Sequence, residues 1–106
     1  MHPNIGTFME SSRQDILLSL KLLKAEMKKE FSVQNIGVFG SVARDEQTDQ
    51  SDIDLLVEFS SPVGFITFMR LENFLSERLG KKVDQVTPDA LKPVIRQDVL
   101  TEVIYV

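Results

Sequence analysis

The sequence predicts an α/β or α+β fold in which helices cover a small mixed β-sheet. Two long segments carry apolar residues at helical spacing, and short apolar runs typical of strands stand between them. The chain has 106 residues, 42% of them hydrophobic and 26% charged, which is the composition of a globular domain. We expect one domain over residues 11–106, preceded by a flexible leader over residues 1–10.

The first helix is predicted to follow Ser11 and Ser12, because serine caps helix starts. Its apolar stripe comprises Ile16, Leu20, Leu23, Met27 and Phe31, at steps of three or four residues. Its other side carries Lys21, Lys24, Lys28 and Lys29, which we expect to face solvent.

Three short strands are predicted, over residues 35–40, 52–59 and 81–86. A turn that starts with a short helical segment joins the first two strands. A second helix follows the second strand and ends at Gly80; its stripe comprises Phe65, Phe68, Leu71, Leu75 and Leu79. Pro88 and Pro93 each mark a further helix start. The apolar tail over residues 102–106 is predicted to be an edge strand or a contact surface.

Composition excludes several classes of function. The chain has 16 acidic and 12 basic residues and a net charge of -4, so we expect no direct binding to nucleic acid. It has no cysteine, which rules out thiolate metal sites and fits a reducing cytoplasm. The single histidine, His2, cannot build a zinc site or a histidine-based triad. No signal peptide is visible and every apolar run is too short for a membrane, so we expect a cytoplasmic protein.

Two aspartates stand where the second strand begins, although aspartate is a poor strand residue. Side chains two residues apart on a strand point to the same face, so Asp52 and Asp54 should project together, with Cα atoms about 6.6 Å apart. Two carboxylates this close repel each other, and a divalent cation such as Mg²⁺ would offset that repulsion. Alone, this pair would more often be an exposed strand end.

Gly40 and Ser41 follow the first strand directly. Glycine allows close approach of the backbone, exposed N–H groups at a helix start attract phosphate, and Ser41 adds a hydroxyl donor. Arg44 could reach the same phosphates. Such a pair alone is most often an ordinary turn. The combination of Gly40-Ser41, ten residues, and then Asp52-x-Asp54 is far more specific.

This combination resembles the signature of the DNA polymerase β-like nucleotidyltransferases. The string FGSVARDEQTDQSDIDLLVEF is similar to the minimal nucleotidyltransferases, the MNT (MntA-type) antitoxins that are paired with HEPN toxins. The resemblance runs over nearly the whole chain and implies a single minimal nucleotidyltransferase domain. It also implies that Ser41 holds the nucleotide triphosphate and that Asp52 and Asp54 bind Mg²⁺.

The family also has a third carboxylate on a neighbouring strand, which completes the metal site and helps to activate the acceptor hydroxyl. By position this residue is Asp84, which alternation places on the face opposite Val83 and Gln85. One departure concerns Asp45, because relatives usually have glycine after the arginine. Either the turn is tighter here, or an adjacent negative charge draws Arg44 away from the phosphates.

The resemblance implies transfer of AMP from ATP to a hydroxyl, with release of pyrophosphate. The expected acceptor is a tyrosine of a cognate HEPN ribonuclease toxin, which the transfer would silence. Two alternatives remain open: a binding-only antitoxin, and transfer to a small molecule as in aminoglycoside-modifying relatives. Those relatives usually carry an added helical domain that is not seen here. RNA tailing is disfavoured by the acidic charge balance.

Overall fold

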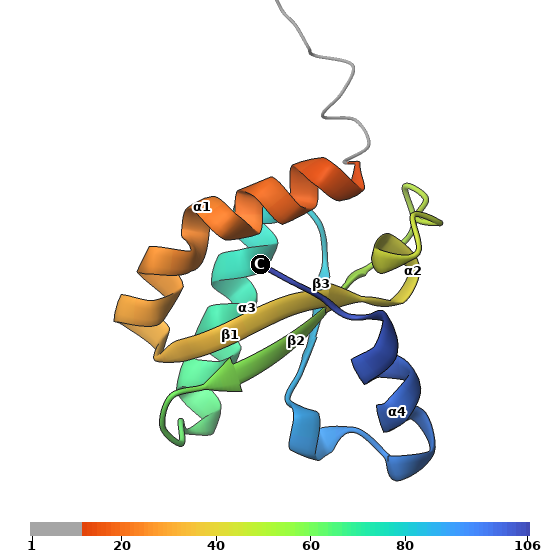
Figure 1. Ribbon diagram of the computed structural model, residues 1–106. Helices are drawn as coiled ribbons and strands as arrows, with labels where there is room; N and C mark the ends of the chain where they lie inside the picture. The colour runs from red at the N-terminus through yellow and green to blue at the C-terminus, as the bar shows by residue number, and fades with distance from the viewer. Residues whose placement is uncertain (1–11) are drawn as a thin grey trace, which may run out of the picture.

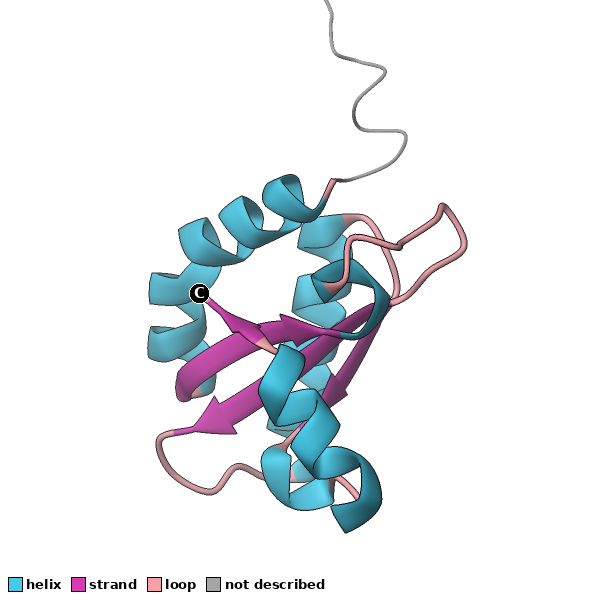
Figure 2. Ribbon diagram, turned by 45° about the vertical axis from the view of Figure 1, so that its right-hand side comes forward, coloured by secondary structure: helices cyan, strands magenta, loops and turns pink. Residues whose placement is uncertain are grey.

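The computed structural model describes residues 12–106, which form a four-stranded sheet with helices on both faces (Figures 1 and 2). The elements are α1 (Arg13–Phe31), β1 (Val33–Phe39), α2 (Gly40–Ala43), β2 (Ile53–Phe59), α3 (Phe65–Leu79), β3 (Val83–Val86), η2 (Pro88–Ala90), α4 (Pro93–Glu102) and β4 (Ile104–Tyr105). The predicted fold class is therefore confirmed. The predicted leader lies outside the described residues.

The strands of the sheet are ordered β3-β2-β1-β4. β1 runs antiparallel to both β2 and β4, whereas β2 and β3 are parallel. A parallel pair needs a crossover connection, and α3 supplies it between β2 and β3. The sheet is thus mixed, and the parallel pair brings the start of β2 beside the start of β3.

The two faces of β2 have different neighbours. Ile53, Leu55 and Val57 are fully buried in the main core, with apolar side chains of α1 and α3. Leu56 points to the opposite face and packs with Leu91 and with Val99 of α4. Because side chains alternate along a strand, Asp54 shares this second face with Leu56. The predicted alternation is confirmed.

Helix α1 begins as predicted, because the Ser12 hydroxyl accepts a hydrogen bond of 3.0 Å from the Asp15 N–H. Four of the five stripe residues are buried, and Leu23 packs at the edge of the core. The prediction for Lys24 was wrong. Its Nζ donates a 2.8 Å hydrogen bond to the carbonyl oxygen of Val106, which ties α1 to the C-terminal strand.

Several details differ from the predictions: β1 begins at Val33 instead of residue 35, and β3 begins at Val83 instead of residue 81. Gly40 is not part of β1 but opens α2, because its φ of 74° turns the chain out of the strand. In α3, Leu71 and Leu75 are buried as expected, but Phe65 is 76% exposed because it stands in the first turn, before the helix reaches the core. Gly80 ends α3 with a φ of 69°, as predicted.

The C-terminal tail is an edge strand, which was one of its two predicted roles. β4 pairs with β1 through Gly37↔Tyr105 and Val38↔Ile104. A Cβ at Gly37 would lie 2.6 Å from Val103 Cγ2 and 3.1 Å from the Ile104 carbonyl oxygen. Gly37 therefore makes room for the tail.

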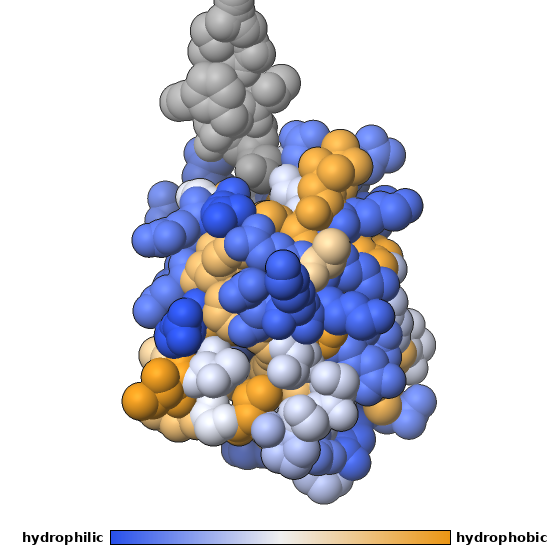
Figure 3. Space-filling view, turned by 90° about the vertical axis from the view of Figure 1, so that its left-hand side faces the viewer, coloured by the Kyte–Doolittle hydropathy of each residue, from blue (hydrophilic) through white to orange (hydrophobic). Residues whose placement is uncertain are grey.

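Two surface features complete the description. Within residues 12–106, the helices are too short or too polar to cross a membrane. The side of the molecule seen in Figure 3 is largely hydrophilic, and its apolar side chains stand in separate groups.

Candidate active site

The three predicted acidic residues lie at neighbouring strand starts. Asp54 of β2 is in register with Asp84 of the parallel strand β3, so both side chains project from the same face of the sheet. Asp52 directly precedes β2. Asp84 is exposed between buried Val83 and Gln85, as the alternation predicted. The fold therefore brings together acids that are 30 residues apart in the sequence.

Asp54 is the acid most affected by this arrangement. Burial, together with the negative charges of Asp84, Asp52 and Glu102, raises the pKa of its carboxyl group to about 6, although the positive charge of Arg44 opposes this shift. Lys82 offsets little of this negative charge, because its ammonium is 4.0 Å from the Asp52 carboxylate and its side chain is largely exposed. The carboxylates thus form an anionic cluster that no strongly placed positive charge within residues 12–106 balances.

Gly40 brings the loop after β1 onto this cluster. Any side chain at this position would collide with the Asp54 carboxylate, because a Cβ would meet Oδ2 and lie 3.0 Å from Cγ. The positive φ also favours glycine. Ser41, the next residue, is half-buried at the start of α2. The predicted phosphate-binding pair therefore lies beside the predicted metal-binding acids.

Arg44 is held by two carboxylates. Its Nε donates to Glu46 Oε1 over 3.0 Å, and its Nη1 donates to Glu102 Oε1 over 2.9 Å. The hydrogen bonds to Glu46 and Glu102 raise the pKa of the guanidinium. Asp45 has a φ of 59°, a backbone conformation that favours glycine. The charges that engage Arg44 thus come from Glu46 and Glu102.

Glu102 is the site residue that the sequence analysis missed. It ends α4, and its Oε2 accepts a 2.6 Å hydrogen bond from the backbone N–H of Gly40, while its other oxygen accepts from Arg44. Glu102 and Gly40 are 62 residues apart. No local pattern marks this residue, because the contact depends on how α4 packs beside α2.

The acidic cluster fits a magnesium ion by its chemistry. Carboxylate oxygens are the ligands that Mg²⁺ prefers, and the repulsion that raises the pKa of Asp54 is what a bound cation would relieve. Within residues 12–106 no group of three or more acidic or histidine side chains is arranged so that it could hold a metal ion by itself. An open arrangement suits Mg²⁺, which keeps waters and substrate phosphates among its ligands.

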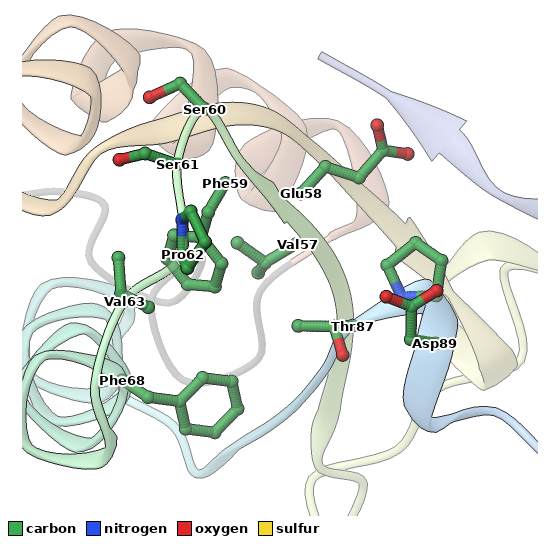
Figure 4. A pocket seen from close by; sticks show the side chains of 11 residues that line it. Val57, Glu58, Phe59, Ser60, Ser61, Pro62, Val63, Phe68, Thr87 and Asp89 are labelled. Carbon is green, nitrogen blue, oxygen red and sulfur yellow. The ribbon is translucent and has the colours of Figure 1, made fainter.

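A larger hollow lies at the other end of β2. It has a volume of about 710 Å³, and Phe59, Pro62 and Phe68 contribute to its wall (Figure 4). The hollow contains none of the three aspartates. Glu58 borders it and is occupied by hydrogen bonds from Asn35 and the Tyr105 hydroxyl, at 3.2 and 3.3 Å. The candidate site is therefore the acidic cluster rather than this hollow.

Comparisons with known sequences show the family of this chain. A model of the nucleotidyltransferase domain family matches residues 20–106. The chain is 43% identical over 97 residues to a "Putative protein adenylyltransferase" of Methanocaldococcus jannaschii, covering 91% of this chain and 96% of the relative. It is also 43% identical over 83 residues to the protein adenylyltransferase MntA of Thermococcus cleftensis, covering 78% and 84%. The chain therefore belongs to the nucleotidyltransferase domain family, with MntA-type protein adenylyltransferases as its relatives.

Solved structures show the same architecture. A "putative minimal nucleotidyltransferase" has a TM-score of 0.78 at 32% identity, covering 90% of this chain and 96% of that one. A chain of a toxin–antitoxin complex with AMP-PNP has a TM-score of 0.67 at 27% identity, covering 82% and 70%. A chain from the complex of the tri-AMPylated Shewanella oneidensis HEPN toxin with its MNT antitoxin has a TM-score of 0.61 at 25% identity, covering 88% and 70%.

Proposed function

We propose that this protein transfers AMP from ATP to a tyrosine hydroxyl of a HEPN-family ribonuclease toxin and thereby acts as its antitoxin. The observation that carries the proposal is the contact between the Gly40 loop and Asp54, which itself stands in register with Asp84. A phosphate-binding loop beside paired carboxylates is the arrangement that nucleotidyl transfer requires.

The residues divide the work of the reaction. The Gly40-Ser41 loop and Arg44 would hold the triphosphate, and Asp52, Asp54 and Asp84 would hold Mg²⁺. When bound, Mg²⁺ supplies the positive charge that offsets the charge of the triphosphate. Asp84 would also help to activate the acceptor hydroxyl. The tyrosine oxygen forms a bond to the α-phosphorus, the bond between the α-phosphorus and the leaving oxygen breaks, and pyrophosphate departs.

The choice of ATP and of a toxin as acceptor is supported by the relatives. One similar structure holds the ATP analogue AMP-PNP, and another contains a HEPN toxin that carries AMP. The net charge of -4 suits a ribonuclease with a basic RNA-binding face, because opposite charges speed encounter. An AMP group near the toxin's catalytic residues would add bulk and negative charge, which would repel RNA. The cytoplasmic location stays a prediction.

The proposal is tested by expressing the protein together with its cognate toxin and mapping modified toxin peptides by mass spectrometry. We expect AMP on a toxin tyrosine with the wild-type protein and none with Asp52→Asn. The Asp52→Asn variant should also fail to protect cells. If the toxin is silenced but unmodified, and Asp52→Asn protects equally well, the protein is a binding-only antitoxin. Modification of an added aminoglycoside instead of the toxin would favour the small-molecule alternative.

A further inference from the structure

Glu102 occupies groups that the proposed triphosphate would need. Its two carboxylate oxygens accept hydrogen bonds from the Gly40 N–H and from Arg44, at 2.6 and 2.9 Å. Both donors belong to the loop that faces Asp54. A carboxylate and a phosphate are both anions that accept two parallel hydrogen bonds, so they compete for the same donors.

We propose that Glu102 is an internal competitor of the nucleotide: its carboxylate takes the place of a phosphate oxygen on Gly40 and Arg44 and must leave before the triphosphate binds there. This inference rests on the proposed function, because it concerns the same phosphate-binding groups. No covalent bond changes. One anionic acceptor replaces another on the same two donors, and Glu102 returns when pyrophosphate departs.

The charge balance of the loop supports competition. In the nucleotide-free protein Arg44 is shared by Glu46 and Glu102, so these three side chains together carry a net charge of about -1 at neutral pH. Asp54 and Asp84 add further negative charge on the same face. A triphosphate that approaches this loop is repelled until a cation binds and Glu102 withdraws. Removing the Glu102 charge should therefore strengthen triphosphate binding.

The position of Glu102 also links the nucleotide to the C-terminal strand. Glu102 is the last residue of α4, and β4 begins two residues later. Tyr105 of β4 pairs with Gly37 and its hydroxyl donates to Glu58. Movement of Glu102 should therefore change the surroundings of Tyr105, which is the single tyrosine of a chain that has no tryptophan. Tyrosine fluorescence can report it.

The test compares binding of AMP-PNP in the presence of Mg²⁺, measured by titration calorimetry, in three proteins. Glu102→Gln keeps an oxygen acceptor for Gly40 but removes the charge, and should bind AMP-PNP about tenfold more tightly than wild type, the size expected for one charge-assisted contact. Glu26→Gln removes an exposed carboxylate that pairs with Arg78, and should bind like wild type. Mg²⁺ alone should bind Glu102→Gln no more tightly than wild type, because that variant has lost an anion.

A second variant allows the inference to be tested even if Glu102→Gln fails to fold. Glu102→Asp keeps the charge but shortens the side chain, so it cannot reach both donors, and it should also bind AMP-PNP more tightly. In the wild type, AMP-PNP with Mg²⁺ should change the fluorescence of Tyr105, and in Glu102→Gln this change should be smaller.

Two results would overturn the inference in distinguishable ways. If folded Glu102→Gln and Glu102→Asp bind AMP-PNP as wild type does or more weakly, Glu102 supports the loop instead of competing, and the proposed function stands. If neither wild type nor the variants bind AMP-PNP although all of them unfold cooperatively, the proposed function fails together with the inference.

Discussion

At the scale of single residues, the site depends on Asp54 being crowded from several sides. The Asp54 carboxylate lies so close to Gly40 that no side chain fits at position 40. Asp84 stands in register beside Asp54 on the neighbouring strand. Burial and neighbouring negative charge raise the pKa of Asp54 to about 6. This crowding costs stability in the metal-free protein, and a bound cation would recover it.

The first prediction is that Asp54→Asn stabilises the metal-free protein at pH 7.5. The folded pKa lies above the unfolded value of 3.8, so ionised Asp54 destabilises the fold above about pH 6 and the penalty disappears towards pH 4. We expect about 1 kcal/mol after allowance for solvent screening, or a rise in melting temperature of roughly 4 °C. Melting with a chelator present, from pH 4 to 8, measures it.

The pH dependence provides the control for that prediction. The difference between Asp54→Asn and wild type should shrink as the pH falls through 6. A variant that melts below wild type at pH 7.5 would mean that Asp54 has a structural role in the folded protein.

The second prediction is that Ser41→Ala and Asp84→Asn fail in different ways. Ser41→Ala removes a donor to the phosphates, so it should weaken AMP-PNP binding and slow transfer without abolishing it. Asp84→Asn should bind the nucleotide but stop transfer, because the acceptor hydroxyl is no longer activated. Calorimetry beside a transfer assay separates the two. Normal transfer by Asp84→Asn would show that the third carboxylate is another residue.

At the scale of elements, the C-terminal segment closes the sheet and supplies a site residue. α4 ends at Glu102, which binds the loop after β1, and β4 then pairs with β1 itself. Lys24 of α1 holds the carbonyl of Val106. The last five residues are therefore bound both to the sheet and to the loop after β1.

The third prediction is that Gly37→Ala destabilises the protein by about 1–3 kcal/mol, the cost of overpacking. The new methyl group would press against Val103 and the backbone carbonyl of Ile104, which cannot move without disturbing β4. Denaturant unfolding measures the change. Gly64→Ala is the matched control, because a Cβ there meets nothing within 4 Å, and it should change stability by less than about 1 kcal/mol. Equal effects of both substitutions would mean that the tail does not depend on Gly37.

At the scale of the whole molecule, the fold joins four separate segments of the chain into one anionic site. The loop after β1, the starts of β2 and β3, and the end of α4 meet beside Asp54. The main core, built from α1, α3 and the sheet, lies on the opposite face of β2. The main core and the proposed site therefore lie on different faces of the sheet.

The fourth prediction concerns the response of the whole protein to its proposed ligands. Mg²⁺ with AMP-PNP should raise the melting temperature of wild type. When the free ligand is a hundredfold above its dissociation constant, the free energy of unfolding should increase by about 2.7 kcal/mol. Asp52→Asn should lose most of this gain, whereas Glu77→Gln, which removes an exposed acid of α3, should keep it. Differential scanning fluorimetry measures all three proteins. Equal gains would exclude Asp52 from the metal site.

Much of this molecule could be predicted from the order of its residues. Apolar spacing indicated α1 and α3, and alternation indicated the buried face of β2. The Gly40-Ser41 and Asp52-x-Asp54 pairs indicated the candidate site. Each of these patterns is local, so it can be read from neighbouring residues. The pairing of Asp54 with Asp84, the role of Lys24 and the contact of Glu102 with Gly40 and Arg44 were decided by the tertiary structure. Lys24 and Val106 are 82 positions apart, and Gly40 and Glu102 are 62 positions apart. Such contacts depend on strand register and helix packing, which no local periodicity encodes.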